Sequence, residues 1–212
     1  MKPASHRPVI VPAAPGFVRI IGGLWKRSKL AVPARPGLRP TPDRVRETLF
    51  NWLGQDLTGL RCLDAFAGSG ALGFEAASRG AVQVLLCEQD PGLAAGLRAN
   101  AERLKATQIK VQRGDAIATL KGASRGSWDL VFLDPPFGDN GNEALFTQAL
   151  QAAVLASSAV NRMFEYRRVI PGMTWLSEEL GQRARVGLIN RGLSETGGDR
   201  SYRRHDGLAA AG

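Results

Sequence analysis

The sequence predicts an α/β domain built on a mostly parallel β-sheet with helices on both faces. From about residue 60 onward, short apolar runs alternate with segments of helical periodicity, which is typical of β-α-β units. A chain of 212 residues with 44% hydrophobic and 22% charged side chains can bury a sizeable core, which excludes wholesale disorder. A mean hydropathy of -0.13, without any long apolar run, argues against a membrane-spanning helix.

The N-terminal part of the chain is expected to stand apart from this domain. Residues 1–16 contain four prolines and no continuous apolar stretch, so we expect a flexible tail rather than a signal peptide. Extended runs on either side of Gly22 and Gly23 predict a β-hairpin, and a proline-rich loop follows it. We therefore divide the chain into the tail, a basic hairpin and loop extension at 17–40, and the main domain at 41–212.

The main domain is expected to begin with a helix. Thr41 as the N-cap and Pro42 at the first helical position mark its start, and Gly54 marks its end. The remaining elements are expected as strands at 60–63, 82–87, 109–112 and 130–133, helices at 71–79, 91–105, from about 115, and at 142–156, and strand-like runs at 160–166, 184–189 and 201–204. In such a sheet, ligands bind at the carboxyl ends of the strands.

The positive charge is concentrated near the N-terminus. The chain carries 28 Lys and Arg against 19 Asp and Glu, a net charge of +9. Residues 1–46 hold ten of the basic side chains and one acid, Asp43, whereas 47–212 hold eighteen of each sign. An excess of this kind favours a polyanion such as RNA, because phosphate contacts release counterions. Within 17–46 the cations alternate with apolar residues such as Phe17, which indicates a folded RNA-binding element; for 1–16 a solubilising tail is the better interpretation.

The two cysteines point to a reducing compartment. Cys62 and Cys87 both lie in apolar strand-like runs, where buried thiols are expected. Two cysteines are too few for a disulfide framework or a four-ligand zinc site. We therefore expect a cytoplasmic protein without a metal centre.

A glycine-rich loop follows the first strand of the main domain. The segment DAFAGSGALG contains a G-x-G-x-x-G pattern starting at Gly68, and Glu88 follows twenty residues later, as in a dinucleotide site. In a dinucleotide site, however, the first glycine follows the strand almost directly. Here Asp64 intervenes, and its charge would repel a pyrophosphate but attract the ammonium group of S-adenosylmethionine. S-adenosylmethionine is favoured over a dinucleotide, and a purely structural turn ranks third.

Two more acids follow the next two strands. Glu88 is placed where a carboxylate can accept from both hydroxyls of a ribose, and Asp115 where one can accept from an adenine amino group. Each acid alone is more often a solvated loop residue. Three acids at the carboxyl ends of consecutive strands favour a cofactor site.

A fourth acid begins the motif Asp134-Pro135-Pro136-Phe137, directly after a hydrophobic strand. The two prolines fix the backbone there. Asp134 and the carbonyl of Pro135 can each accept one N–H of a nucleobase amino group, which localises its lone pair and aims it at a sulfonium methyl group. Phe137 can stack on the base, which must be unpaired or flipped out to reach such a pocket.

These motifs carry a resemblance to a known family. Four motifs within residues 64–137 resemble those of the Rossmann-like class I methyltransferases that act on amino groups: DAFAGSG, CEQD, GDA and DPPF. Two N-terminal segments resemble the RsmD-type family, the guanine-N2 methyltransferases of 16S ribosomal RNA. They are RIIGGLWKRSKLAVP at 19–33 and LRPTPDRVRETLFNWLG at 38–54. The resemblance implies a seven-stranded sheet, an N-terminal hairpin that helps bind RNA, and an assembled or assembling small ribosomal subunit as substrate.

The resemblance also implies roles for individual residues. Those expected to bind S-adenosylmethionine are Asp64, Phe66, Gly68, Gly70, Glu88, Asp115 and Ala116. Those expected to hold the guanine are Asp134, Pro135, Pro136 and Phe137. Those expected to contact RNA are Arg19, Lys26, Arg27, Lys29, Arg39 and Arg44, and Arg39, Thr41, Arg44 and Glu47 are expected to line the site. The stretch at 191–212 matches the family pattern poorly.

Two other functions remain open at this point. The motif Asp-Pro-Pro-Phe does not determine which base is methylated, so N6-adenine or N4-cytosine methylation of DNA is an alternative. Against a sequence-specific DNA enzyme, the 212 residues show no separate target-recognition domain. A non-catalytic RNA-binding factor of ribosome assembly is another, although the complete motif set argues against a vestigial pocket. We expect a monomer whose partner is ribosomal RNA or the assembling small subunit, without a membrane association.

Overall fold

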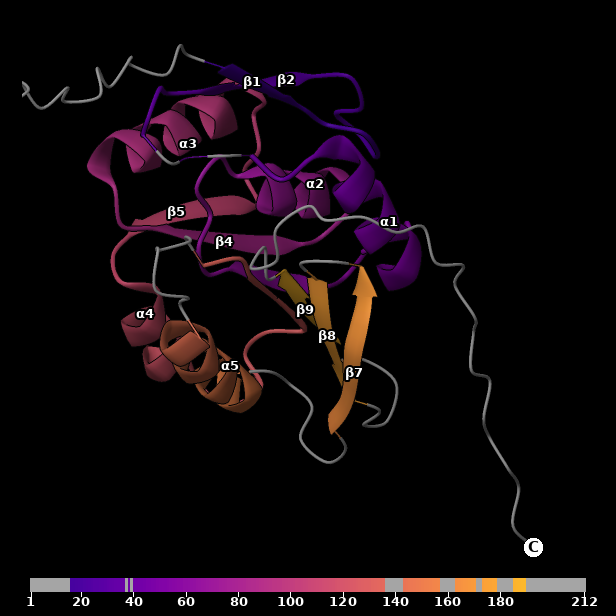
Figure 1. Ribbon diagram of the computed structural model, residues 1–212. Helices are drawn as coiled ribbons and strands as arrows, with labels where there is room; N and C mark the ends of the chain where they lie inside the picture. The colour runs from indigo at the N-terminus through magenta and orange to yellow at the C-terminus, as the bar shows by residue number, and fades with distance from the viewer. Residues whose placement is uncertain are drawn as a thin grey trace, which may run out of the picture.

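The protein is described by a computed structural model that covers residues 16–36, 38, 40–135, 143–156, 163–170, 173–178 and 185–189. Over this part of the chain it has one seven-stranded sheet, in the order β5-β4-β3-β6-β9-β8-β7, and a separate two-stranded hairpin, β1-β2 (Figure 1). The strands are β1 (Gly16–Arg19), β2 (Lys29–Val32), β3 (Arg61–Asp64), β4 (Gln83–Glu88), β5 (Ile109–Arg113), β6 (Leu130–Leu133), β7 (Met163–Ile170), β8 (Met173–Glu178) and β9 (Arg185–Ile189).

The sheet is mostly parallel, as the sequence predicts. Strands β5, β4, β3, β6 and β9 run side by side in the same direction. Strand β8 pairs antiparallel with both β9 and β7. The seven-stranded sheet that the resemblance implies is therefore confirmed for the described residues.

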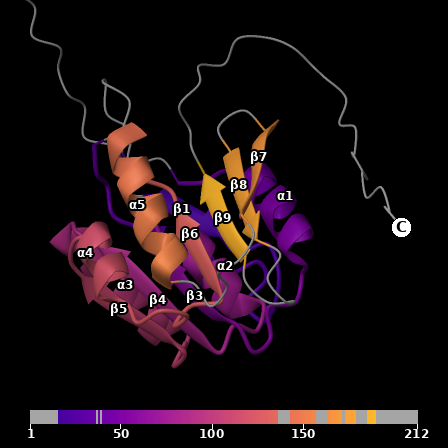
Figure 2. The same cartoon turned by 90° about the horizontal axis from the view of Figure 1, so that it is seen from below.

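Helices cover both faces of the sheet. Helices α1, α2 and α3 cover one face of the sheet and enclose a first hydrophobic core. Helices α4 and α5 cover the other face and enclose a second core (Figures 1 and 2). Along β6, Leu130 and Phe132 enter the first core while Val131 and Leu133 enter the second, which explains why this strand is apolar at every position. The helices are α1 (Asp43–Leu53), α2 (Ala71–Ser78), α3 (Pro91–Arg103), α4 (Ala116–Gly122) and α5 (Glu143–Ala156). No helix in the described segments is both long and apolar enough to span a membrane.

The hairpin packs on the outer side of α2 and α3. The side chain of Asn100 on α3 accepts from the backbone N–H of Ala31 and donates to its carbonyl, as a neighbouring strand would. At the other end, the turn of the hairpin bonds to Ser78, whose hydroxyl donates to the Gly22 carbonyl and accepts from the Trp25 N–H. The hairpin is thus fixed to the domain at both of its ends.

Some boundaries differ from the sequence prediction. Thr41 is not the N-cap of α1: the cap position is Pro42, the first helical residue is Asp43, and the Thr41 hydroxyl bonds elsewhere. Strand β8 was not expected, because its short segment lacks a clear alternation. The tail predicted at 1–16 lies outside the described residues except for Gly16, which begins β1, and the strand predicted at 201–204 lies outside them entirely.

Candidate active site

The predicted acids of β3, β4 and β6 meet at one edge of the sheet. Asp64 at the end of β3 pairs in register with Leu86 of β4 and Phe132 of β6. Glu88 and Asp134 therefore lie two residues further along the two strands that flank Asp64. Because all three strands are parallel, these carboxyl groups share the carboxyl-terminal edge, where the sequence predicts ligand binding.

Asp64 is the most deeply buried of these acids, with 1% of its surface exposed. One oxygen, Oδ2, accepts from the Gly73 N–H at 3.0 Å, while Oδ1 is buried without a hydrogen-bond partner in the described residues. Burial, reinforced by the charges of Asp134 and Glu88, raises the pKa of Asp64 to about 7, although the Gly73 bond acts in the opposite direction. A buried acceptor left without a donor is costly, so this site is suited to a ligand that brings a donor or a positive charge.

The glycine loop is held by the second acid. The Gly68 N–H donates to Glu88 Oε2 at 2.7 Å, and the Asp90 N–H donates to Glu88 Oε1 at 2.8 Å. Each carboxylate oxygen can accept a second hydrogen bond, so Glu88 can hold the loop and still receive a ribose hydroxyl. Gly70 has a positive φ of 77°, and an added Cβ there would lie 2.5 Å from Leu97, so the loop requires glycine.

Asp115 lies two residues beyond Arg113 of β5, which pairs in register with Glu88 of β4. It is exposed, and as the N-cap of α4 its Oδ1 accepts from the Ala118 N–H at 2.7 Å. It lines a cavity of about 440 Å³ near α4, together with Gln112, Thr119 and Trp128. Of the seven residues predicted to bind the cofactor, this cavity includes only Asp115. The other six lie outside it: Asp64, Phe66, Gly68, Gly70, Glu88 and the buried Ala116.

At the reacting end, Asp134 directly follows β6 and is half-buried, and Pro135 after it is buried. The hydroxyl of Thr41 donates to Asp134 Oδ2 at 3.2 Å. This contact brings the loop before α1 to the carboxyl group that the sequence predicts to hold the guanine amine. Pro136 and Phe137 lie outside the described residues, so their roles stay predictions.

The predicted RNA-binding residues spread over the hairpin and α1. Lys26, Arg27, Lys29 and Arg44 are exposed, and Arg39 lies outside the described residues. Arg19 is exposed but forms an ion pair with Asp43 at 2.9 Å. Phe17, one of the apolar residues between these cations, is 67% exposed, with the Lys29 ammonium 5.7 Å from its ring centre. Glu47 is exposed and lines a second cavity beside Lys26, near the hairpin turn.

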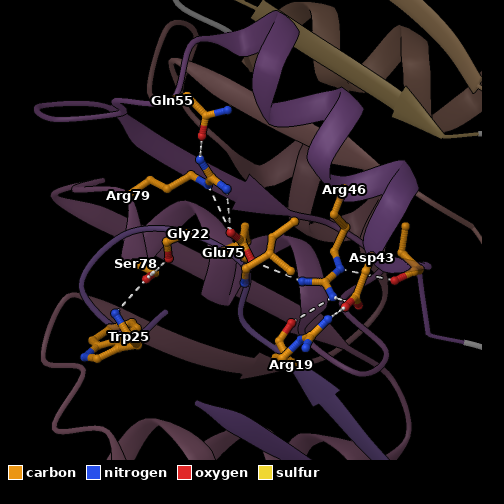
Figure 3. Close-up of polar contacts among 12 residues, drawn as sticks. Arg19, Gly22, Trp25, Asp43, Arg46, Gln55, Glu75, Ser78 and Arg79 are labelled. Atoms are coloured by element: carbon orange, nitrogen blue, oxygen red, sulfur yellow. Dashed lines mark hydrogen bonds and ion pairs between the residues drawn. The ribbon is translucent and has the colours of Figure 1, made fainter. Parts of the chain in front are cut away.

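A buried ionic network beside the site was missed by sequence reasoning (Figure 3). By sequence, Arg46 belongs to the excess of basic residues in 1–46, yet its side chain has no exposed surface. Its Nη1 donates to Glu75 Oε2 at 3.0 Å. Glu75 is equally buried and accepts from Arg79 through its other oxygen at 2.8 Å. The signal that was available is Glu75 itself, because one acid within the otherwise uncharged helix ALGFEAAS requires a buried partner.

Comparisons with known proteins identify the family of this chain. The family described as "Conserved hypothetical protein 95" matches residues 18–176. The chain belongs to this family. Residues 18–176 run from the hairpin to β8 and include all four predicted acids as well as Arg46 and Glu75, so the family signature covers the site and the ionic network together.

Curated relatives match this chain over somewhat more than half of its length. It is 51% identical over 123 residues to ribosomal RNA small subunit methyltransferase D of Escherichia coli (strain K12), covering 58% of this chain and 61% of that one. It is 49% identical over 132 residues to the protein of the same name from Haemophilus influenzae, covering 61% and 68%. The chain thus spans less than two thirds of the length of the Escherichia coli relative. The predicted RsmD-type membership is confirmed.

Solved structures of similar proteins confirm the fold. The family member is 38% identical to a putative methyltransferase, yhhF, from Escherichia coli, with a TM-score of 0.61, covering 80% of this chain and 96% of that one. It is 37% identical to the putative methylase HI0767 from Haemophilus influenzae, with a TM-score of 0.56, covering 79% and 94%. The predicted class I methyltransferase fold is confirmed.

Proposed function

We propose that this protein transfers a methyl group from S-adenosylmethionine to the exocyclic N2 amine of a guanine in small-subunit (16S) ribosomal RNA. The observation that carries the proposal is the position of Asp134 on the sheet edge beside the buried Asp64 and the glycine loop. A single edge thereby holds an acceptor for a nucleobase amino group next to an acceptor for a cationic cofactor.

The cofactor part of the proposal rests on the chemistry of the acids. S-adenosylmethionine, when bound, supplies an electrophilic methyl group on a sulfonium. Asp64 would hold its ammonium group, directly or through water, which gives the buried Oδ1 the donor it lacks. Glu88 would accept from the ribose, and Asp115 from the adenine. Phe66 and Ala116 would contribute apolar surface, while Gly68 and Gly70 let the backbone approach the cofactor.

The lack of an ion-pair partner for the cofactor acids, within the described residues, supports S-adenosylmethionine over a dinucleotide. Among the described residues, no Lys or Arg forms an ion pair with Asp64, Glu88 or Asp115. An edge with several negative charges repels a pyrophosphate and attracts a ligand with positive charge.

At the reacting end, Asp134 and the Pro135 carbonyl would each accept one N–H of the guanine amino group. Both acceptors follow directly from the rigid strand β6, so they are oriented before the substrate arrives. The two acceptors would localise the amine lone pair and aim it at the methyl group that the bound cofactor supplies. The amine proton leaves to Asp134 or to water. Pro136 would fix the turn and Phe137 would stack on the base.

The RNA part of the proposal rests on the hairpin and on the names of the relatives. Phe17 and Lys29 lie together on the outward face of the hairpin, and Lys26 and Arg27 extend from its turn. An exposed ring beside cations suits an unpaired base with its flanking phosphates. Arg19, Arg39 and Arg44 would add phosphate contacts. We further propose that the protein acts as a monomer in the cytoplasm, where ribosomal RNA is assembled into the subunit.

Nucleoside analysis of ribosomal RNA tests this function. We expect that 16S RNA from cells lacking the protein has less N2-methylguanosine, and that the purified protein with labelled cofactor restores it. The Asp134→Ala variant should not restore it. Unchanged N2-methylguanosine in the deletion strain, or label appearing only on adenine or cytosine, would overturn the proposal.

A further inference from the structure

The hydroxyl of Thr41 contacts the carboxyl group to which the proposed function gives the reacting role. Its Oγ1 donates to Asp134 Oδ2 at 3.2 Å, across 93 positions of the sequence. We propose that Thr41 is a positioning residue that fixes the orientation of the Asp134 carboxylate for the methyl-accepting amine. This inference rests on the proposed function, since it assigns Thr41 a part in the same reaction.

The backbone of Thr41 is restrained from both sides. Thr41 lies between Pro40 and Pro42, and a residue before proline is confined to extended conformations. Only 6% of its surface is exposed, so the side chain has little room for other rotamers. The hydroxyl is therefore held in place before any substrate binds.

A buried guanidinium adds a third restraint. Arg46 Nε donates to the Thr41 carbonyl at 3.2 Å. Its Nη2 donates to the Arg19 carbonyl at the end of β1 at 2.8 Å, and its Nη1 pairs with Glu75 of α2 (Figure 3). The same guanidinium thus fixes the loop that carries Thr41 to the hairpin and to the helix that follows the glycine loop.

Thr41 also departs from what its local sequence favours. A threonine just before a helix usually caps it through its side-chain oxygen. Here the cap position belongs to Pro42, without a side-chain bond, and the Thr41 hydroxyl bonds to Asp134 instead. Departures of this kind are expected where function overrides local stability.

The benefit is expected in the chemical step rather than in binding. A carboxylate after a strand can rotate about its terminal torsion, whose preference is broad. A donor fixed on Oδ2 selects one plane for the group, so an N–H of the amine meets an acceptor that is already oriented. Removal of the donor leaves the pocket in place and lowers the fraction of carboxylates in the productive orientation.

Valine in place of Thr41 tests the proposal, because it keeps the shape and removes the donor. Single-turnover methylation is measured with saturating RNA and S-adenosylmethionine, alongside the affinity for each. We expect Thr41→Val to slow the rate by roughly ten- to a hundredfold, the range for a hydrogen bond to a charged group, with both affinities nearly unchanged. Thr41→Ser should recover most of the rate. Thr48→Val, which removes a hydroxyl on α1 that bonds only within its helix region, is the matched control and should behave like the wild type.

Three results would overturn the inference. They are an unchanged rate in Thr41→Val, a serine variant as slow as the valine variant, or a valine defect confined to RNA or cofactor affinity. Thr41→Ala, which needs no additional space, gives the same comparison should the valine variant be unstable. Wild type and Asp134→Ala are run in the same assay. An inactive wild type or a fully active Asp134→Ala contradicts the proposed function. An active wild type and an inactive Asp134→Ala, together with a fully active Thr41→Val, contradict the role of Thr41 alone.

Discussion

Two groups of charged residues lie close together in this protein and are built in opposite ways. In the ionic network, the carboxylate of Glu75 accepts from Arg46 through one oxygen and from Arg79 through the other. At the sheet edge, Asp64 and Glu88 accept only backbone N–H donors among the described residues, and one oxygen of Asp64 has no donor at all.

The difference separates a structural role from a binding role. A buried acid between two guanidinium groups is neutralised in the folded protein, so it needs no ligand and joins the hairpin, α1 and α2 into one unit. Asp64 and Glu88, which form no ion pair within the described part of the chain, keep a local negative field at the edge. The expected occupant of that edge is a cation, and the proposed cofactor carries both an ammonium and a sulfonium.

The largest effect is expected at the sheet edge. Asp134→Ala should lower the rate of methyl transfer by at least about a hundredfold, as loss of an oriented polar group in an active site does, while cofactor affinity stays nearly intact. Single-turnover assays and calorimetry measure the two quantities. Asp56→Ala removes an exposed carboxyl group elsewhere and serves as the control. Equal activity of the Asp134 variant and the wild type would refute the assignment.

In the ionic network the effect should appear in stability. Arg46→Met leaves Glu75 without one of its two buried partners, and such losses cost about 3–5 kcal/mol. Arg19→Met breaks only the exposed pair with Asp43, which should cost roughly 0–1 kcal/mol. Urea denaturation at one pH compares the two variants. Equal losses would show that the network does not differ from a surface ion pair.

The buried Asp64 predicts an unusual pH dependence. Its pKa of about 7 lies above the value of about 3.9 for an unfolded aspartate. As pH rises, the folded protein therefore loses this proton at a higher pH than the unfolded chain does. In the absence of ligand, Asp64 should therefore lower the free energy of unfolding as pH rises from about 4 to 7, by at most about 1.4 kcal/mol per pH unit, with no further loss above pH 7.

Denaturation of wild type and Asp64→Asn across this range measures that contribution. The difference in the free energy of unfolding should move in favour of the asparagine variant as pH rises. Asp56→Asn, where the carboxyl pKa is lowered by the Thr58 bonds, should leave the dependence between pH 4 and 7 unchanged. A difference between Asp64→Asn and wild type that stays constant with pH would mean that folding does not raise the pKa of Asp64.

The smallest effect is expected on the exposed side of the hairpin. Replacing Lys26, Arg27 and Lys29 with glutamine should weaken RNA binding and reduce the salt slope of log K by up to about 2, at roughly 0.7 per phosphate contact. Filter binding over a salt series measures the slope. A triple variant at the exposed Lys105, Lys110 and Lys121 is matched in charge and should keep the wild-type slope. Equal slopes for both variants would remove the hairpin from the RNA surface.

Much of the site follows from sequence because it depends on local order. Strands β3, β4 and β6 are apolar runs that end in an acid or directly before one, so Asp64, Glu88 and Asp134 reach the same edge whatever the details of packing. The glycine loop is equally local, because its positive φ values at Gly68 and Gly70 demand glycine.

The features that sequence missed depend on contacts between distant segments. Arg46 is one of ten basic residues in its region, and only its partner 29 positions away shows that it is buried. Thr41 resembles an ordinary helix cap until the fold brings Asp134 beside it.

The central claim is that the acidic edge binds a sulfonium cofactor rather than a dinucleotide. Calorimetric titration of the purified protein with S-adenosylmethionine, S-adenosylhomocysteine and NAD tests it most directly. We predict saturable binding of the first two, weakened by Asp64→Asn, and none of NAD. Binding of NAD without binding of either sulfur compound would contradict the account.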